Sequence, residues 1–165
     1  MPEHKPMEVL FVEDDPAVRL GSTQALQLAG LAVTGFPSAE KVLERLAPGM
    51  AGVLVTDVKL PGMDGLELLE RALKIDPTMP VILVTGHGDI TMAVQAMRLG
   101  AYDFLEKPFS PEQLTDVVRR AQDKRALSLE VEHLRSRLAG FESIETLLIG
   151  RSAAMQQLRR LVRDV

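Results

Sequence analysis

The sequence predicts an α/β fold in which helices cover both faces of a doubly wound, five-stranded parallel sheet. Two observations lead to this fold class. Five short apolar segments alternate with five longer segments of helical character, and short loops rich in Gly, Pro and Asp separate them. This alternation is typical of parallel sheets with right-handed crossover connections. Each connection is too short to form a separate domain, so we expect one compact domain.

The composition excludes several classes of protein. The chain has 165 residues, 46% of them hydrophobic, which suffices for one domain and an appendage. It contains no Cys, so disulfides and thiolate metal sites are ruled out. A net charge of −4 does not provide the basic surface that nucleic-acid binding requires. The apolar runs are too short to span a membrane and the first residues do not resemble a secretory signal, so we expect a cytoplasmic location without membrane or direct nucleic-acid contact.

The first half of the chain contains two pairs of a strand and a helix. The apolar run 9–12 predicts a strand. The helix that follows has Pro16 in its first turn, where proline is favoured, and ends at Gly30. A weaker strand at 31–34 precedes a helix capped by Ser38. The apolar residues expected on the buried sides of these two helices are Leu20, Ala25, Leu26, Leu28, Val42, Leu43 and Leu46.

The second half repeats this pattern three times. Apolar runs predict strands at 53–56, 81–85 and 102–106. Asp64, Asp89 and Ser110 stand where the following helices should begin. The helix after Asp89 is expected to turn four residues toward the core, namely Ile90, Ala93, Val94 and Met97. For five such units the common solution is the flavodoxin-like strand order 2-1-3-4-5, in which the first and third strands are neighbours.

Chemically active side chains follow four of the predicted strands. Asp14 and Asp15 follow the first, Asp57 the third, Thr85 ends the fourth and Lys107 follows the fifth. Because the carboxyl ends of parallel strands meet at one edge of a sheet, we expect these residues to converge there. Singly, each has an ordinary structural explanation, such as an Asp that satisfies turn amides or a Thr that favours a strand. Their common position at one edge favours a functional site.

The residue types indicate chemistry on a phosphoryl group. Crowded carboxylates repel one another unless a cation lies among them, and Mg²⁺ is the cation that prefers carboxylate oxygens and water. Asp57 then becomes a nucleophile toward phosphorus. Lys107 and Thr85 can stabilise the phosphoryl oxygens by charge and by hydrogen bonding. We expect Glu13, the first acid after the strand, to face solvent rather than a metal ion.

The pattern resembles the receiver domain of two-component response regulators over roughly residues 7 to 125. The matching motifs are Glu13-Asp14-Asp15, Asp57 with Leu60-Pro61-Gly62-Met63-Asp64-Gly65, Thr85-Gly86 and Lys107-Pro108-Phe109. The resemblance implies that Asp57 is the phosphoacceptor, that Lys107 contacts the phosphoryl group, and that Thr85 and Phe104 form a switch. It implies Mg²⁺ as cofactor, with these ligands: Asp14, Asp15, Asp57 and the backbone carbonyl of Lys59. It also places Lys59 and His87 beside the path of the water that hydrolyses the acyl phosphate.

The last predicted helix is longer than a receiver domain needs. Leu127, Val131, Leu134 and Leu138 recur at alternate spacings of four and three, which is typical of a coiled-coil seam. We therefore expect a homodimer through a short parallel coiled coil. The alternative is a solvated linker helix that lies on its own domain. The expected domains are a receiver at 7–125, a helical linker at 126–146 and the start of another domain at 147–165.

The segment 147–165 resembles the beginning of the AAA+ ATPase domain of NtrC-like activators of sigma-54 RNA polymerase. No phosphate-binding loop of the Gly-x-x-x-x-Gly-Lys type is present, so ATP hydrolysis by that route is excluded. The stretch 84–104 resembles most the regulators of four-carbon dicarboxylate transport. The resemblance implies these partners for a longer protein: a sensor histidine kinase, the AAA+ domain, sigma-54 RNA polymerase and DNA.

Three functions are compatible with the residues. The first is a signalling switch that accepts a phosphoryl group from a histidine kinase on Asp57; beyond uptake from small donors and slow autodephosphorylation, it is not an enzyme. The second is a Mg²⁺-dependent phosphatase that works through an aspartyl phosphate, although such enzymes carry a second Asp where this chain has Lys59. The third is an interaction domain that needs no phosphorylation, which the complete set of site residues disfavours.

Overall fold

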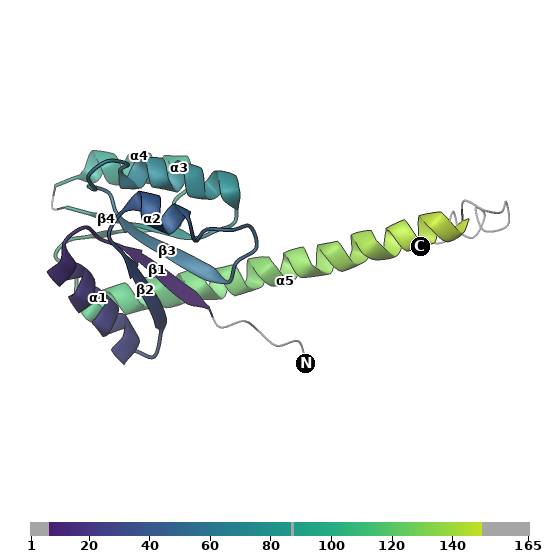
Figure 1. The fold of residues 1–165 in the computed structure, drawn as a ribbon, viewed down its shortest axis with the longest axis horizontal. Helices are drawn as coiled ribbons and strands as arrows, with labels where there is room; N and C mark the ends of the chain where they lie inside the picture. The colour runs from purple at the N-terminus through teal and green to yellow at the C-terminus, as the bar shows by residue number, and fades with distance from the viewer. Residues whose placement is uncertain (1–6, 87, 150–165) are drawn as a thin grey trace. The chain divides into compact units, whose positions relative to one another are not determined.

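In the computed structural model, residues 7–86 and 88–149 are described, with side chains as far as residue 140. Five strands alternate with five helices, as predicted (Figure 1). The strands are β1 (Glu8–Val12), β2 (Ala32–Phe36), β3 (Gly52–Asp57), β4 (Val81–Thr85) and β5 (Asp103–Glu106). The helices are α1 (Pro16–Leu28), α2 (Ala39–Leu43), α3 (Gly65–Ile75), α4 (Ile90–Leu99) and α5 (Pro111–Ile149).

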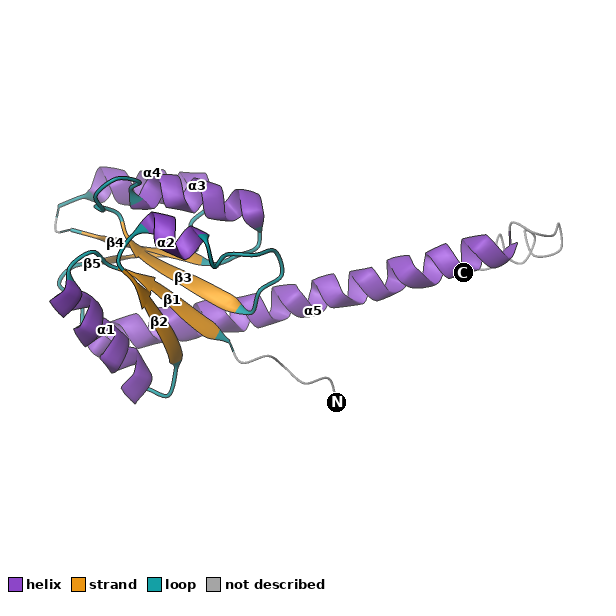
Figure 2. Ribbon diagram, viewed as in Figure 1, coloured by secondary structure: helices purple, strands orange, loops and turns teal. Residues whose placement is uncertain are grey.

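The strands form one parallel sheet in the order β2-β1-β3-β4-β5 (Figure 2). This confirms the predicted fold class and strand order. Val12 pairs with Thr56, Asp57 with Val84, and Thr85 with Glu106. The register therefore aligns the carboxyl ends of β1, β3, β4 and β5 along one edge of the sheet.

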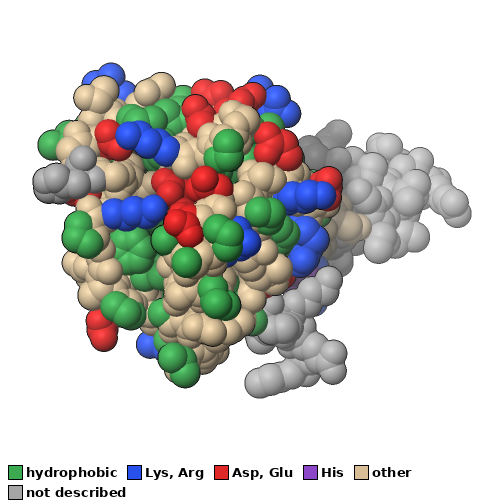
Figure 3. Space-filling model, turned by 60° about the vertical axis from the view of Figure 1, so that its left-hand side comes forward, with side chains coloured by type: hydrophobic (Ala, Val, Ile, Leu, Met, Phe, Trp, Pro, Cys, Tyr) green, Lys and Arg blue, Asp and Glu red, His purple; other side chains and the backbone are tan. Residues whose placement is uncertain are grey.

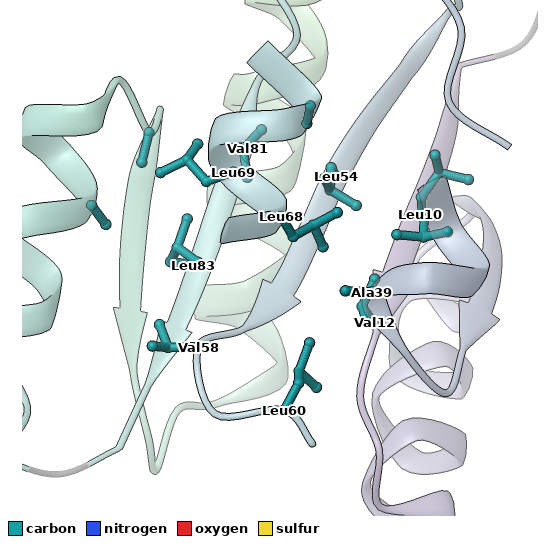
Figure 4. Close-up of a cluster of buried hydrophobic side chains, with 14 of the residues drawn as sticks. Leu10, Val12, Ala39, Leu54, Val58, Leu60, Leu68, Leu69, Val81 and Leu83 are labelled. Atoms are coloured by element: carbon teal, nitrogen blue, oxygen red, sulfur yellow. The ribbon is translucent and has the colours of Figure 1, made fainter. Parts of the chain in front are cut away.

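The core consists of two apolar layers, one on each face of the sheet. Helices α2, α3 and α4 cover one face, where Leu68 and Leu69 of α3 pack against Leu54, Val81 and Leu83 (Figure 4). Helix α1 and the first turns of α5 cover the other face (Figure 2). The buried residues of that layer are Val9, Phe11, Leu26, Val53, Val55, Ile82, Val84, Leu114, Val117, Val118 and Ala121. Both faces are covered by helices, as the continuous apolar runs of a buried parallel sheet require.

Two predicted helix faces are only partly correct. On α4, Ile90, Val94 and Met97 are exposed, and only Ala93 and Ala96 are buried. On α1, Leu20 and Leu28 are exposed and Leu26 is buried. Since small side chains let α4 approach the sheet closely, the larger apolar residues remain on its outer side. Apolar periodicity alone does not reveal which stripe turns inward.

Helix α2 is shorter than the sequence predicts. Ser38 caps it as expected, because its Oγ accepts a hydrogen bond of 3.2 Å from the Lys41 amide. Beyond Leu43, the Arg45 amide bonds to the Val42 carbonyl at 2.9 Å and the Leu46 amide to the Leu43 carbonyl at 3.3 Å. These bonds reach back three residues rather than four, so the chain tightens into a turn and the helix ends.

A fully buried ion pair ties α5 to the loops that precede β3 and β4. Arg125 has an exposed fraction of 0%, and its Nη2 donates to Asp76 Oδ2 at 2.6 Å. The same guanidinium donates to Thr78 Oγ1 at 2.8 Å and to the Met50 carbonyl at 3.0 and 3.2 Å. Asp76 also accepts from the Gly49 and Thr78 amides. Both charges are thus paired and hydrogen-bonded, as burial of an ion pair demands.

The chain divides into two compact units, Met1–Ser128 and Leu129–Val165. The first contains the sheet with its covering helices, and the described part of the second is helical. The predicted boundaries at 125 and 146 stay predictions, and segment 150–165 lies outside the described residues. Within the described ranges, no helix combines the length and apolar character that crossing a membrane requires.

Candidate functional site

The site lies at the carboxyl edge of the sheet, where β3 delivers Asp57 and the loop after β5 delivers Lys107. The Lys107 Nζ donates to Asp57 Oδ2 at 2.9 Å and lies 3.8 Å from Glu13 Oε2. The Asp57 side chain is only 12% exposed. On one face of the molecule, acidic side chains gather beside basic ones and among hydrophobic ones (Figure 3). The fold thus brings the Asp57 carboxylate and the Lys107 amine together, although the two residues lie 50 positions apart in the sequence.

Three carboxylates form an acidic cluster, which we define as Glu13, Asp14 and Asp57. One oxygen of each lies within 4.8 Å of the others. Glu13 is 4% exposed, so the expectation that it faces solvent is wrong. Its amide bonds to the Phe36 carbonyl at 3.0 Å, which continues the pairing of β1 with β2 by one residue and fixes Glu13 at the sheet edge.

Asp15, which the sequence placed among the metal ligands, lies outside the acidic cluster and caps α1 instead. Its Oδ1 accepts hydrogen bonds from the amides of Ala17 at 2.9 Å and Val18 at 3.3 Å. Its position directly before Pro16 was the signal for this role, since an N-cap precedes a first-turn proline. The acids grouped with Asp57 are Glu13 and Asp14, and the metal-ligand role of Asp15 stays a prediction.

The electrostatics of the cluster show an excess of negative charge. Burial, a hydrogen bond with Asp57 and the charge of Asp57 raise the pKa of Glu13 from 4.5 to about 7. Burial alone would lower the pKa of Lys107, but the hydrogen bond to Asp57 and the charges of Asp57 and Glu13 raise it above 10.5. Lys107 is therefore a firm cation at neutral pH, where Glu13, with a pKa of about 7, is only partly ionised. The site favours a further cation.

Two neighbours position the groups of the site. Arg19, which sequence reasoning missed, donates from Nη1 to the Glu13 carbonyl at 2.7 Å. The Lys59 amide donates to Asp57 Oδ1 at 3.2 Å, and the Lys59 Nζ pairs with Asp89 Oδ2 at 3.4 Å. The metal-ligand role of the Lys59 carbonyl stays a prediction. His87 lies outside the described residues.

Thr85 and Phe104, the predicted switch pair, lie on adjacent strands beside the site. Thr85 is 2% exposed at the end of β4, and its carbonyl accepts the Lys107 amide at 2.8 Å. Phe104 on β5 is 41% exposed, so it is not a core residue. Both line a pocket of about 110 Å³ between α4 and the sheet. The pocket offers space into which a side chain can move.

Comparison with known proteins agrees with this geometry. Residues 9–119 match the model of the response regulator receiver domain. The chain is 49% identical over 155 residues to the C4-dicarboxylate transport transcriptional regulatory protein DctD of Pseudomonas aeruginosa, covering 94% of this chain and 34% of that protein. It is 38% identical to the DNA-binding transcriptional regulator NtrC of Escherichia coli, covering 93% and 32%.

Solved structures give the same result. NtrX from Brucella abortus in complex with ADP is similar with a TM-score of 0.70 and 33% identity, covering 98% of this chain and 34% of that one. The chain spans about a third of the length of the curated relatives named above. These matches confirm the resemblance to NtrC-like regulators that the motifs indicated. The chain belongs to the response regulator receiver domain family.

Proposed function

We propose that the chain is a phosphorylation switch in which Asp57 accepts a phosphoryl group from the phosphohistidine of a sensor kinase. The observation that carries this proposal is the contact of 2.9 Å between Lys107 Nζ and Asp57 Oδ2, beside the carboxylates of Glu13 and Asp14. The Asp57 carboxylate is thus partly shielded from solvent and contacts the Lys107 ammonium, a cation that can also bind phosphoryl oxygens. This arrangement suits acceptance of a dianionic group.

The acidic cluster fits Mg²⁺, and Glu13, Asp14 and Asp57 would hold it. Three carboxylates within reach of one another, one of them with its pKa raised to about 7, provide hard oxygen ligands and uncompensated charge. When bound, Mg²⁺ supplies charge neutralisation for the phosphoryl oxygens. The Lys59 carbonyl remains a proposed further ligand.

In the proposed transfer, an oxygen of the Asp57 carboxylate attacks the phosphorus atom. The new P–O bond forms as the P–N bond to the kinase imidazole breaks, and the imidazole leaves with the electron pair of that bond. Lys107 stabilises the phosphoryl oxygens through its charge, and Thr85 turns its hydroxyl toward them. Movement of Thr85 opens space that Phe104 fills, which changes the α4 and β5 surface.

Incubation with acetyl phosphate and Mg²⁺ tests this function. We expect intact-mass spectrometry to show one added phosphoryl group per chain, lost completely in Asp57→Asn, because the amide is a poor nucleophile. Asp64→Asn, which changes another acid at the start of a helix, serves as the control and should retain uptake. Continuous release of phosphate over many turnovers would favour the phosphatase, and no uptake would favour the phosphorylation-independent interaction domain.

The similarity to known regulators also supports proposals about the longer protein. We propose that the chain is part of a longer regulator of four-carbon dicarboxylate transport, as the similarity to DctD suggests. In that protein the receiver would control an AAA+ domain that acts on sigma-54 RNA polymerase at DNA in the cytoplasm. The receiver itself would not contact DNA.

The long helix supports a homodimer. We define the seam as Leu127, Val131, Leu134 and Leu138. In a single chain, the exposed fractions of these four residues are 62%, 39%, 50% and 63%, in that order. Such a stripe on a helix is stable in water when a second copy covers it. We propose a parallel coiled coil between two copies.

We expect light scattering to give a dimer for the wild type and a monomer for Leu134→Asp, because a charge in the seam opposes coiled-coil pairing. The control is Leu28→Asp, at a leucine on α1 that is 90% exposed, which should remain dimeric. A wild-type monomer at high protein concentration contradicts the dimer and supports a solvated linker helix.

A further inference from the structure

Helix α4 begins without the cap that its sequence provides. Asp89 occupies the N-cap position, yet its side chain makes no capping hydrogen bond, and its ψ of 49° is not extended. At α1, α2 and α3, the N-cap residues Asp15, Ser38 and Asp64 are extended and their side chains accept first-turn amides. Asp is among the best capping residues, so something holds its carboxylate elsewhere.

The carboxylate of Asp89 is turned back toward the phosphoacceptor loop. Its Oδ2 lies 3.4 Å from Lys59 Nζ. The same oxygen lies so near the end of β4 that a Cβ added to Gly86 would meet it at 3.1 Å. The Asp89 side chain is 24% exposed. It is therefore held over the strand end, away from the amides of α4.

Lys59 joins this carboxylate to the phosphoacceptor. Its amide donates to Asp57 Oδ1 at 3.2 Å while its ammonium binds Asp89. One residue thus contacts both the group that would be phosphorylated and the N-cap residue of α4. A new phosphoryl group on Asp57 would carry more negative charge than the Asp89 carboxylate and would compete for the same ammonium.

We propose that Lys59 and Asp89 form a latch that holds α4 in its unphosphorylated position and opens when Asp57 is phosphorylated. This inference rests on the proposed function of Asp57. On opening, Lys59 turns to the phosphoryl group, and Asp89 rotates to accept the amides of Thr91 or Met92 as a normal N-cap. The signal at Asp57 then becomes a change at the beginning of α4.

The surroundings of Asp89 allow this movement. The pocket of about 110 Å³ is lined by Asp89 together with Thr85, Ile90, Val94 and Phe104. Ile90 is 70% exposed, so its side chain does not hold Asp89 in place. The Lys59 side chain is 71% exposed, so its ammonium can leave Asp89 without breaking a buried contact.

Amide hydrogen exchange of the 165-residue chain tests the latch without phosphate. In Lys59→Met, the freed Asp89 carboxylate should cap the Thr91 or Met92 amide. We therefore expect these amides to exchange about fivefold more slowly than in the wild type, which corresponds to the stabilisation that one ordinary N-cap provides. Lys74→Met, at an exposed lysine on α3, should leave both rates unchanged. Lys59→Met combined with Asp89→Ala should abolish the slowing, since no carboxylate remains to cap. Unchanged rates in Lys59→Met overturn the latch.

A second measurement tests whether phosphorylation opens it. Wild type with beryllofluoride and Mg²⁺ should show the same slowing at Thr91 and Met92, and Asp89→Ala should not. Slowing in Lys59→Met but none with beryllofluoride would refute the opening step. Failure of the wild type to take up phosphate from acetyl phosphate refutes the proposed function separately, because the Lys59→Met result requires no phosphoryl group.

Discussion

Replacement of Arg125 by Met is expected to lower the free energy of unfolding by about 3–5 kcal/mol, because it leaves the buried carboxylate of Asp76 without its charge partner. The Arg125 side chain is 0% exposed and that of Asp76 is 4% exposed, so water does not reach the abandoned carboxylate. Removal of the guanidinium also takes away the donors to the Met50 carbonyl and Thr78 hydroxyl. Urea denaturation at pH 7 measures the change.

The same substitution at Arg120 is the matched control. Arg120 lies on the same helix and pairs with Asp116 at 3.2 Å, but both side chains are more than half exposed. Arg120→Met should change the free energy of unfolding by less than about 0.5 kcal/mol. Combining Arg125→Met with Asp76→Leu should recover part of the loss, since it removes the unpaired charge. Equal effects at positions 120 and 125 would rule out a special role for the buried pair.

The loss of unfolding free energy caused by Arg125→Met should become smaller at acidic pH. Burial alone would raise the pKa of Asp76, but hydrogen bonds from Arg125, Gly49 and Thr78 outweigh it and lower the pKa from 3.8 to about 2. A carboxyl with a depressed folded-state pKa stabilises the fold fully above its unfolded-state pKa. That contribution, about 2 kcal/mol, is lost as pH falls from about 4 to about 2. The gap in stability between wild type and Arg125→Met should therefore narrow across this range.

Replacement of Lys107 by Met should slow phosphoryl uptake from acetyl phosphate by about 100-fold, the usual loss when one fixed group that stabilises transition-state charge is removed. The Lys107 ammonium contacts Asp57 at 2.9 Å and lies 3.8 Å from Glu13, so it is already in place before a phosphoryl group arrives. Intact-mass spectrometry over time gives the rate.

Magnesium binding distinguishes a chemical role for Lys107 from a structural one. Removal of a cation beside the acidic cluster makes its potential more negative, so Mg²⁺ affinity by calorimetry should stay the same or increase. Loss of both uptake and Mg²⁺ binding would instead indicate a collapsed site. Lys41→Met, at an exposed lysine on α2, should change neither measurement.

The contrast between Glu13 and Asp15 shows how far local sequence rules extend. From the sequence, Asp14 and Asp15 were expected at the site and Glu13 in solvent, but the bond between the Glu13 amide and the Phe36 carbonyl of the neighbouring strand holds Glu13 at the sheet edge. Asp15 has a local signal, the following proline, and that signal pointed to a cap. The local rule was available in the sequence but was not applied to Asp15, whereas the position of Glu13 depends on pairing between strands.

By itself, the sequence determined the order of strands and helices, the parallel sheet and the presence of Asp57 and Lys107 at strand ends, because periodicity, caps and turn residues act over a few positions. Only the tertiary structure decided that Arg125 is buried against Asp76, that α4 turns Ala93 and Ala96 inward, and that Lys59 holds Asp89. Those contacts join segments distant in the chain. Their partners are selected by packing of helices on the sheet, which no local pattern encodes.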